Sequence, residues 1–112
     1  MIVNKENAEH YHWGQNCDGW HLLKSDSLSV IQECMPAGTA ESRHYHRKTQ
    51  QLFFVLNGEA TMEKEGEEFL LKAQESIHVS NEQKHKISNL SNEDLHFLVI
   101  SEPKSHGDRI NC

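Results

Sequence analysis

Short apolar or alternating segments recur along the chain, and turn-forming residues separate them. The segments that we expect to be strands are 21–23, 28–35, 42–46, 52–56, 59–64, 68–72, 77–80, 85–89 and 95–101. An apolar period of 3.6 residues, which would indicate a helix, does not persist for three turns anywhere. Strands separated by turn signals about every 8 to 12 residues are typical of an all-β sandwich or barrel. The pattern therefore predicts one all-β domain.

Two of these segments carry more detailed expectations. Asn57-Gly58 follows the apolar run 52–56 and is a strong hairpin signal, so we expect 59–64 to return beside that run. Alternation along 28–35 places Ile31, Glu33 and Met35 on one face. If that face points inward, Glu33 is a partly desolvated carboxylate that could act as a general base. If the register is shifted, Glu33 is solvated and has no such role.

Composition limits the classes of function. The chain has 112 residues, 36% of them hydrophobic, which suits a single soluble domain. No apolar run approaches the roughly 18 residues of a membrane span, and the amino terminus lacks a signal-peptide core, so we expect a cytoplasmic location and no membrane partner. The net charge of -6 argues against nucleic acid as a partner. Three cysteines without CxxC spacing indicate free thiols.

The candidate chemistry centres on His44-Tyr45-His46. In an extended segment both imidazoles point to one side and Tyr45 to the other, an arrangement that offers two ligands to one ion. Gln50 and Gln51 follow, and either amide oxygen could add a donor. A further histidine, His85, follows the expected strand 77–80. The competing interpretation is that the HxH segment only packs or lies on the surface.

These residues resemble the two motifs of the cupin family. Gly38, His44, His46, Gln51 and Gly58 fit the spacing of the first motif, and His85 and Asn89 fit the end of the second. The chain departs from the family pattern in having Gln51 where glutamate is usual, and in lacking the Gly-Asp and Pro-x-Gly of the second motif. The resemblance implies a cupin-type jelly-roll barrel with a metal site in its mouth.

The metal ligands implied by this resemblance are His44, His46, Gln51 and His85, with Gln50 as the competing third ligand. The expected cofactor is one divalent transition metal, either Ni, Zn, Mn, Fe or Co. Because all four ligands are neutral, the ion would keep its full charge and act as a strong Lewis acid. His78 alternates with apolar neighbours and is expected to face outward.

Four residues are expected to contact a small-molecule substrate: Met35, Phe53, Phe97 and Ser101. Arg109 could reach the rim of the site or form a surface ion pair. The resemblance implies three candidate functions. The favoured one is non-redox carbonyl or enol chemistry of the kind that sugar isomerases and uronate-ketonising cupins perform, with Glu33 moving a proton. The others are an Fe(II)-dependent dioxygenase and a non-catalytic ligand-binding protein.

The expected domain organisation is an arm at 1–20, the barrel at 21–101 and a tail at 102–112. The family resemblance also implies a homodimer, in which the arm would cover an exposed strand edge. Trp13 and Trp20 are expected to pack, or alternatively to stack on a sugar. His10 and His12 form a second HxH, but it lies in a polar segment and we assign it no ligand role.

Overall fold

The computed structural model describes all residues 1–112 and consists of strands without helices. Its strands are β1 (Glu9–Trp13), β2 (Cys17–Lys24), β3 (Ser29–Met35), β4 (His44–Tyr45), β5 (Gln50–Asn57), β6 (Ala60–Lys64), β7 (Glu67–Leu71), β8 (Ser76–Val79), β9 (His85–Ser88), β10 (Leu95–Glu102) and β11 (Ile110–Asn111). The all-β prediction is confirmed. No helix is present that could span a membrane.

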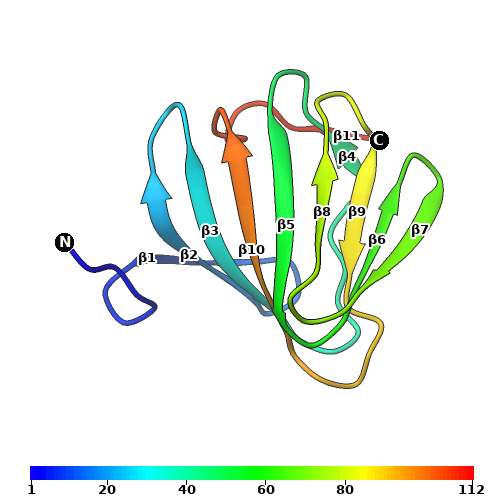
Figure 1. Cartoon of the computed structure of the whole chain (residues 1–112), viewed down its shortest axis with the longest axis horizontal. Coiled ribbons are helices and arrows are strands. Elements are labelled where there is room, and N and C mark those ends of the chain that lie inside the picture. The colour runs from blue at the N-terminus through cyan, green and yellow to red at the C-terminus, as the bar shows by residue number, and fades with distance from the viewer.

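The strands form two antiparallel sheets. The six-stranded sheet has the order β1-β2-β3-β10-β5-β8, and the five-stranded sheet has the order β11-β4-β9-β6-β7 (Figure 1). Some neighbours in the six-stranded sheet are distant in sequence, as in β3 beside β10 and β10 beside β5. This arrangement of strands agrees with the jelly-roll barrel expected from the sequence.

Alternation along the strands builds the core between the sheets. On β5 the inward residues Gln51, Phe53 and Val55 are buried, whereas Leu52 and Phe54 are half-buried on the outer face. The buried apolar cluster contains Cys17, Met35, Phe53, Val55, Ala60, Met62, Leu71, Val79, Ile87, Leu95, Phe97 and Val99. Trp13 packs against this cluster, as expected, and all three cysteines are free.

The prediction of a hairpin at Asn57-Gly58 is wrong. β5 pairs with β8 and β10, whereas β6 pairs with β7 and β9, so the turn carries the chain from one sheet to the other. The turn residues do bend the chain there, and Gly58 has φ +90°. Local turn chemistry predicts a bend, but the pairing of the strands after it depends on the packing of the two sheets.

Both chain ends take part in the sheets. β1 and β2 form a hairpin in register from Glu9 opposite His21 to Trp13 opposite Cys17, so β2 runs across the expected boundary at residue 20. At the other end, β11 pairs with β4. β11 therefore lies beside β4, which carries His44, whereas β2 separates β1 from β3.

Gly58 provides a test of the crossing between the sheets. A Cβ at this position would lie 2.6 Å from the Asp94 carbonyl oxygen, in a backbone conformation that L-residues rarely adopt. We expect Gly58→Ala to lower the free energy of unfolding by about 3 kcal/mol or more, because strain and a backbone clash combine. Urea denaturation measures this loss.

Gly66 is the matched control, since its φ is +84° but a Cβ there would meet nothing within 4 Å. We expect Gly66→Ala to lower the free energy of unfolding by about 1 to 2 kcal/mol, because only conformational strain is added there. Equal losses in the two variants would contradict the tight crossing at Gly58.

Candidate metal centre

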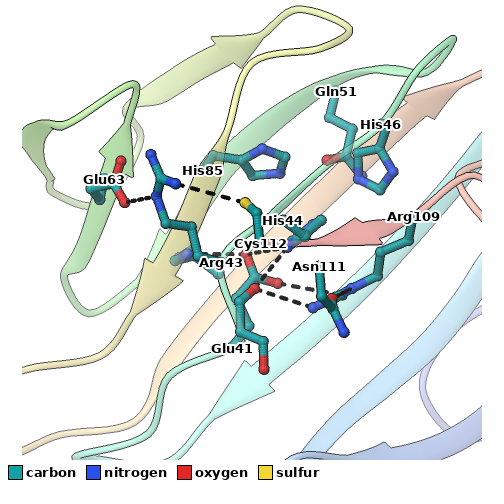
Figure 2. A network of polar contacts seen from close by, with 12 residues as sticks. Glu41, Arg43, His44, His46, Gln51, Glu63, His85, Arg109, Asn111 and Cys112 are labelled. Atoms are coloured by element: carbon teal, nitrogen blue, oxygen red, sulfur yellow. Dashed lines mark hydrogen bonds and ion pairs between the residues drawn. The ribbon is translucent and has the colours of Figure 1, made fainter.

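Three buried histidines converge between the sheets. His44 lies on β4 opposite His85 on β9, and His46 follows two residues later on the same side of the chain. Their imidazole nitrogens can all lie within 4.8 Å of one another, and each residue is at most 4% exposed. Figure 2 shows the three rings directed toward a common space. The structure therefore brings together all three histidines that the sequence motifs indicated.

Backbone carbonyl groups fix the tautomer of each ring. His44 Nδ1 lies 2.8 Å from the Ser42 carbonyl oxygen, His46 Nδ1 lies 2.6 Å from that of Asp108, and His85 Nδ1 lies 2.9 Å from that of Gln83. A carbonyl oxygen can only accept, so each Nδ1 must carry the proton. In a neutral imidazole the lone pair is then on Nε2, which is the usual outer-shell arrangement for metal-binding histidines.

Burial keeps these rings uncharged. It lowers the pKa of His44 to about 3 and that of His85 to about 4, and it lowers the pKa of His46 in the same direction. The hydrogen bonds to the carbonyl groups oppose this effect only in part. At neutral pH all three rings therefore offer a lone pair.

The protein itself leaves two of these three lone pairs unsatisfied. The Nε2 atoms of His46 and His85 are buried and have no hydrogen-bond partner. A buried polar atom without a partner costs about 1 to 3 kcal/mol, so this arrangement is unfavourable unless a ligand occupies it. Three neutral imidazoles with convergent lone pairs match the donors that divalent transition metals accept. The residues present thus fit a metal ion.

The two candidate glutamines point to opposite sides of β5. Gln51 is 6% exposed, and its amide nitrogen donates to Ser101 Oγ at 3.0 Å. Its buried amide oxygen has no partner and lies beside the His46 ring (Figure 2). Gln50 is exposed, and its side chain forms hydrogen bonds with His78 and Glu102. His78 faces outward, as expected. Only Gln51 can contribute an oxygen to the histidine cluster.

A cavity of about 770 Å³ opens in front of His44 and His46, which both line it. Two of the four expected substrate contacts, Phe53 and Ser101, line this cavity. Ser101 also orients Gln51. Met35 and Phe97 instead are fully buried in the apolar cluster and are not among the residues that line the cavity.

Glu33 lies on the cavity wall, as its inward register predicts. Burial, and next to it the charge of Glu41, raise the pKa of Glu33 to about 8. The Tyr11 hydroxyl group donates to Glu33 Oε2 at 3.4 Å. Tyr11, Gly19 and Glu33 are consecutive partners across β1, β2 and β3. A Cβ at Gly19 would meet the Tyr11 ring at 2.2 Å, so this glycine gives the ring the room to reach Glu33.

Glu41 is an acidic residue of the cavity that sequence reasoning missed. Its Oε1 accepts from the Ile87 amide at 3.0 Å, and its Oε2 lies 4.0 Å from Arg109. Burial raises the pKa of Glu41 to about 7, although both of these neighbours lower it. Arg109 lines the cavity and donates to the Ser42 carbonyl oxygen. The position of Arg109 at the rim agrees with the first of its two expected roles.

Asp108 holds the segment between the histidines and Gln51. Its carboxylate accepts from the backbone N–H groups of Arg47, Lys48 and Thr49 and from the Thr49 hydroxyl group, at 2.9 to 3.2 Å. These bonds lower its pKa, although desolvation opposes them. Its own carbonyl oxygen holds the His46 ring. No local pattern indicates Asp108, because its partners lie about sixty residues away.

A family model described as the cupin domain matches residues 31–101, which include all four candidate ligands. The chain belongs to the cupin domain family. An uncharacterised protein of Methanocaldococcus jannaschii is 28% identical over 89 residues, which cover 79% of this chain and 71% of that protein. An oxalate-binding protein of Thermotoga maritima is 27% identical over 85 residues, which cover 71% of this chain and 70% of that protein.

Solved cupin structures share the fold. KdgF from a Halomonas species superposes with a TM-score of 0.84 at 15% identity, covering 93% of this chain and 94% of that one. A cupin described as RmlC-like, from Shewanella frigidimarina, gives a TM-score of 0.83 at 16% identity, covering 96% and 94%. At these identities the similarity establishes the cupin fold and nothing finer.

The two glutamines of this cupin provide a matched pair for testing the site. We expect Gln51→Glu to raise the affinity for divalent metal about tenfold or more, since it adds a negative charge beside the ion. Gln50→Glu should leave the affinity unchanged, because that side chain faces solvent. Competition titration against a chromophoric chelator measures both. An equal gain from both variants, or a gain from Gln50→Glu alone, would refute the assignment of Gln51.

Asp108 should matter both for stability and for metal affinity. Asp108→Asn replaces one acceptor oxygen by a donor, so we expect a loss of about 1.5 to 3 kcal/mol in the free energy of unfolding. Misplacement of His46 should weaken metal binding about 10- to 100-fold. Asp26→Asn, which alters only an exposed pair with Lys104, is the control. Unchanged metal affinity in Asp108→Asn would show that the tail does not position His46.

Proposed function

We propose that this cupin holds one divalent metal through His44, His46, His85 and Gln51 and acts on a small polar metabolite by non-redox carbonyl or enol chemistry. The observation that carries the proposal is the convergence of three buried, neutral imidazoles beside a cavity that also contains Glu33, with the Nε2 atoms of His46 and His85 left without a hydrogen-bond partner. When bound, a divalent ion would supply Lewis-acid polarisation of a carbonyl or enol oxygen. Ni, Zn, Mn, Fe and Co all accept this donor set.

Glu33 is the proposed proton carrier. A general acid–base works best when its pKa lies near the working pH, and burial raises the pKa of Glu33 into that range. In an isomerisation, the carboxylate would remove a proton from the hydroxyl-bearing carbon beside the carbonyl group and return it to the former carbonyl carbon of the enediol. A second proton would pass from the hydroxyl oxygen to the former carbonyl oxygen. Hydrogen only changes position within the substrate, so the reaction needs no oxidant. Tyr11 would hold the carboxyl group in place through its hydrogen bond.

The cavity favours a polar substrate, since only five of its 22 lining residues are hydrophobic. Its three cationic side chains, Lys24, Lys104 and Arg109, are each paired with a carboxylate of the same lining, Glu9, Asp26 and Glu41. A carboxylate or phosphate of a substrate would replace one of these carboxylates as the partner of the cation, while the reacting oxygen lies near the histidines. One of the structurally similar cupins is a sugar phosphate isomerase from Silicibacter pomeroyi, with a TM-score of 0.77 at 16% identity. That similarity is consistent with the proposed chemistry.

Binding without turnover is the second candidate. It is favoured by the similarity to the oxalate-binding protein of Thermotoga maritima and by Arg109, which could bind a dicarboxylate. The Fe(II) dioxygenase has less support, because a ligand set without a carboxylate stabilises oxidised iron less well.

The homodimer and the cytoplasmic location stay predictions. A dimer would cover outward apolar side chains of the six-stranded sheet, where Leu52 lies opposite Ile100 and Phe54 opposite Leu98.

Glu33→Gln separates catalysis from binding. We expect it to lower turnover about 10²- to 10⁴-fold, because the amide cannot accept the proton, while metal content and fold stay intact. Turnover is followed by NMR as exchange of deuterium from D₂O into a panel of sugar phosphates and uronates, with the metal-loaded protein. Glu68→Gln, an exposed change on β7, is the control.

Two outcomes would decide against the favoured proposal. Full activity in Glu33→Gln would remove Glu33 from the mechanism. Absence of exchange in every substrate, together with saturable binding of oxalate to the wild-type protein, would favour the binding function.

A further inference from the structure

His10, His12 and Asp18 gather on the outer face of the β1–β2 hairpin. Tyr11 points inward to the cavity, so the alternation of the strand turns His10 and His12 outward. Asp18 on β2 lies opposite His12 in the register of the hairpin. The outer group shares no residue with the buried cluster of His44, His46 and His85.

The polar atoms of this outer group already lie close together, at distances at or slightly below those between ligands of one ion. Asp18 Oδ1 lies 2.8 Å from His10 Nε2 and 3.0 Å from His12 Nδ1. Ligand atoms at about 2.1 Å from a transition metal, in adjacent coordination positions, lie about 3 to 3.4 Å from each other. The donor atoms of all three residues lie within 4.8 Å of one another. Small rotations of these side chains would therefore admit an ion.

The backbone beneath these side chains is regular. β1 and β2 pair continuously from Glu9 to Trp13, and the turn between them has positive φ at Gly14 and Asn16. The two histidines stand on one strand, two residues apart, and the carboxylate stands on the next. Sites built on paired strands hold their ligands more precisely than sites on loops.

We propose that His10, His12 and Asp18 form a second metal site, selective for divalent ions that prefer imidazole, such as Zn²⁺, Ni²⁺ or Cu²⁺. One carboxylate and two imidazoles are a poor set for Mg²⁺ or Ca²⁺, which prefer several oxygen ligands. The His12 side chain is 76% exposed, so water would complete the coordination and the affinity would be lower than that of the buried site.

An ion in this second site would also restrain the edge of the six-stranded sheet. An ion bound by both strands ties β1, which is an edge strand, to β2. Tyr11 lies between the two histidine ligands and contacts Glu33 on the opposite face. Metal on the outer face would therefore restrain the strand that carries Tyr11 to the cavity.

Zinc titration of the metal-free protein by calorimetry tests the proposal. We expect a tight and a weaker zinc ion per wild-type chain, and only the tight one in His12→Ala and in His10→Ala. His85→Ala should lose the tight ion and keep the weaker one, so failure of one site is distinguishable from failure of the other. His78→Ala, an exposed histidine on β8, should keep both.

Hydrogen exchange supplies a readout at the hairpin itself. Zinc should slow amide exchange in β1 and β2 of His85→Ala and have no such effect in His12→Ala with intact fold. A single zinc ion in the wild-type protein, or a second ion that survives in both His10→Ala and His12→Ala, would overturn the proposal.

Discussion

The candidate site depends on three backbone carbonyl groups that each accept a hydrogen bond from an imidazole Nδ1–H group. They belong to Ser42, Gln83 and Asp108, in three separate segments of the chain. Each Nδ1 proton points away from the centre of the cluster, and burial keeps the rings neutral. The three Nε2 lone pairs therefore face one another. Without these hydrogen bonds the rings could rotate or change tautomer, and the cluster would have no defined ligand geometry. The five-stranded sheet and the carboxy-terminal segment together bring the three carbonyl groups into place, because Ser42 precedes β4, Gln83 precedes β9 and Asp108 precedes β11.

The amino-terminal hairpin and the carboxy-terminal segment therefore complete the site. Tyr11 reaches across Gly19 to Glu33, and Asp108 holds the segment that leads to Gln51. Arg109 brings a positive charge to the rim beside Glu41. A barrel reduced to the residues matched by the family model would keep the ligands but lose these contacts. The chemistry proposed for Glu33 thus relies on residues outside the part of the chain that the family model matches.

Sequence reasoning succeeded where local periodicity determines orientation. The parity of the strands placed His44 with His46, separated Gln51 from Gln50, and grouped Glu33 with Ile31 and Met35. It did not decide which face of 28–35 points inward. It failed where the answer depends on contacts distant in sequence. The turn at Asn57-Gly58 joins two sheets instead of forming a hairpin.

Other features could not be predicted from the sequence for the same reason. No local pattern identifies Asp108, because its carboxylate accepts hydrogen bonds from residues 47–49 only after the chain has folded. Met35 and Phe97 share faces with cavity residues but lie deeper in the core, and alternation does not specify depth. His10 and His12 gain a carboxylate partner only through the pairing of β1 with β2.

The most direct test of the account is X-ray absorption spectroscopy at the metal edge, after less than one equivalent of zinc has been added to the metal-free protein. The account predicts a first shell with three imidazole nitrogens at about 2.0 to 2.1 Å and at least one oxygen. A shell with fewer than three imidazoles, or one made mainly of oxygen ligands, would contradict the assignment of His44, His46 and His85 as the metal centre.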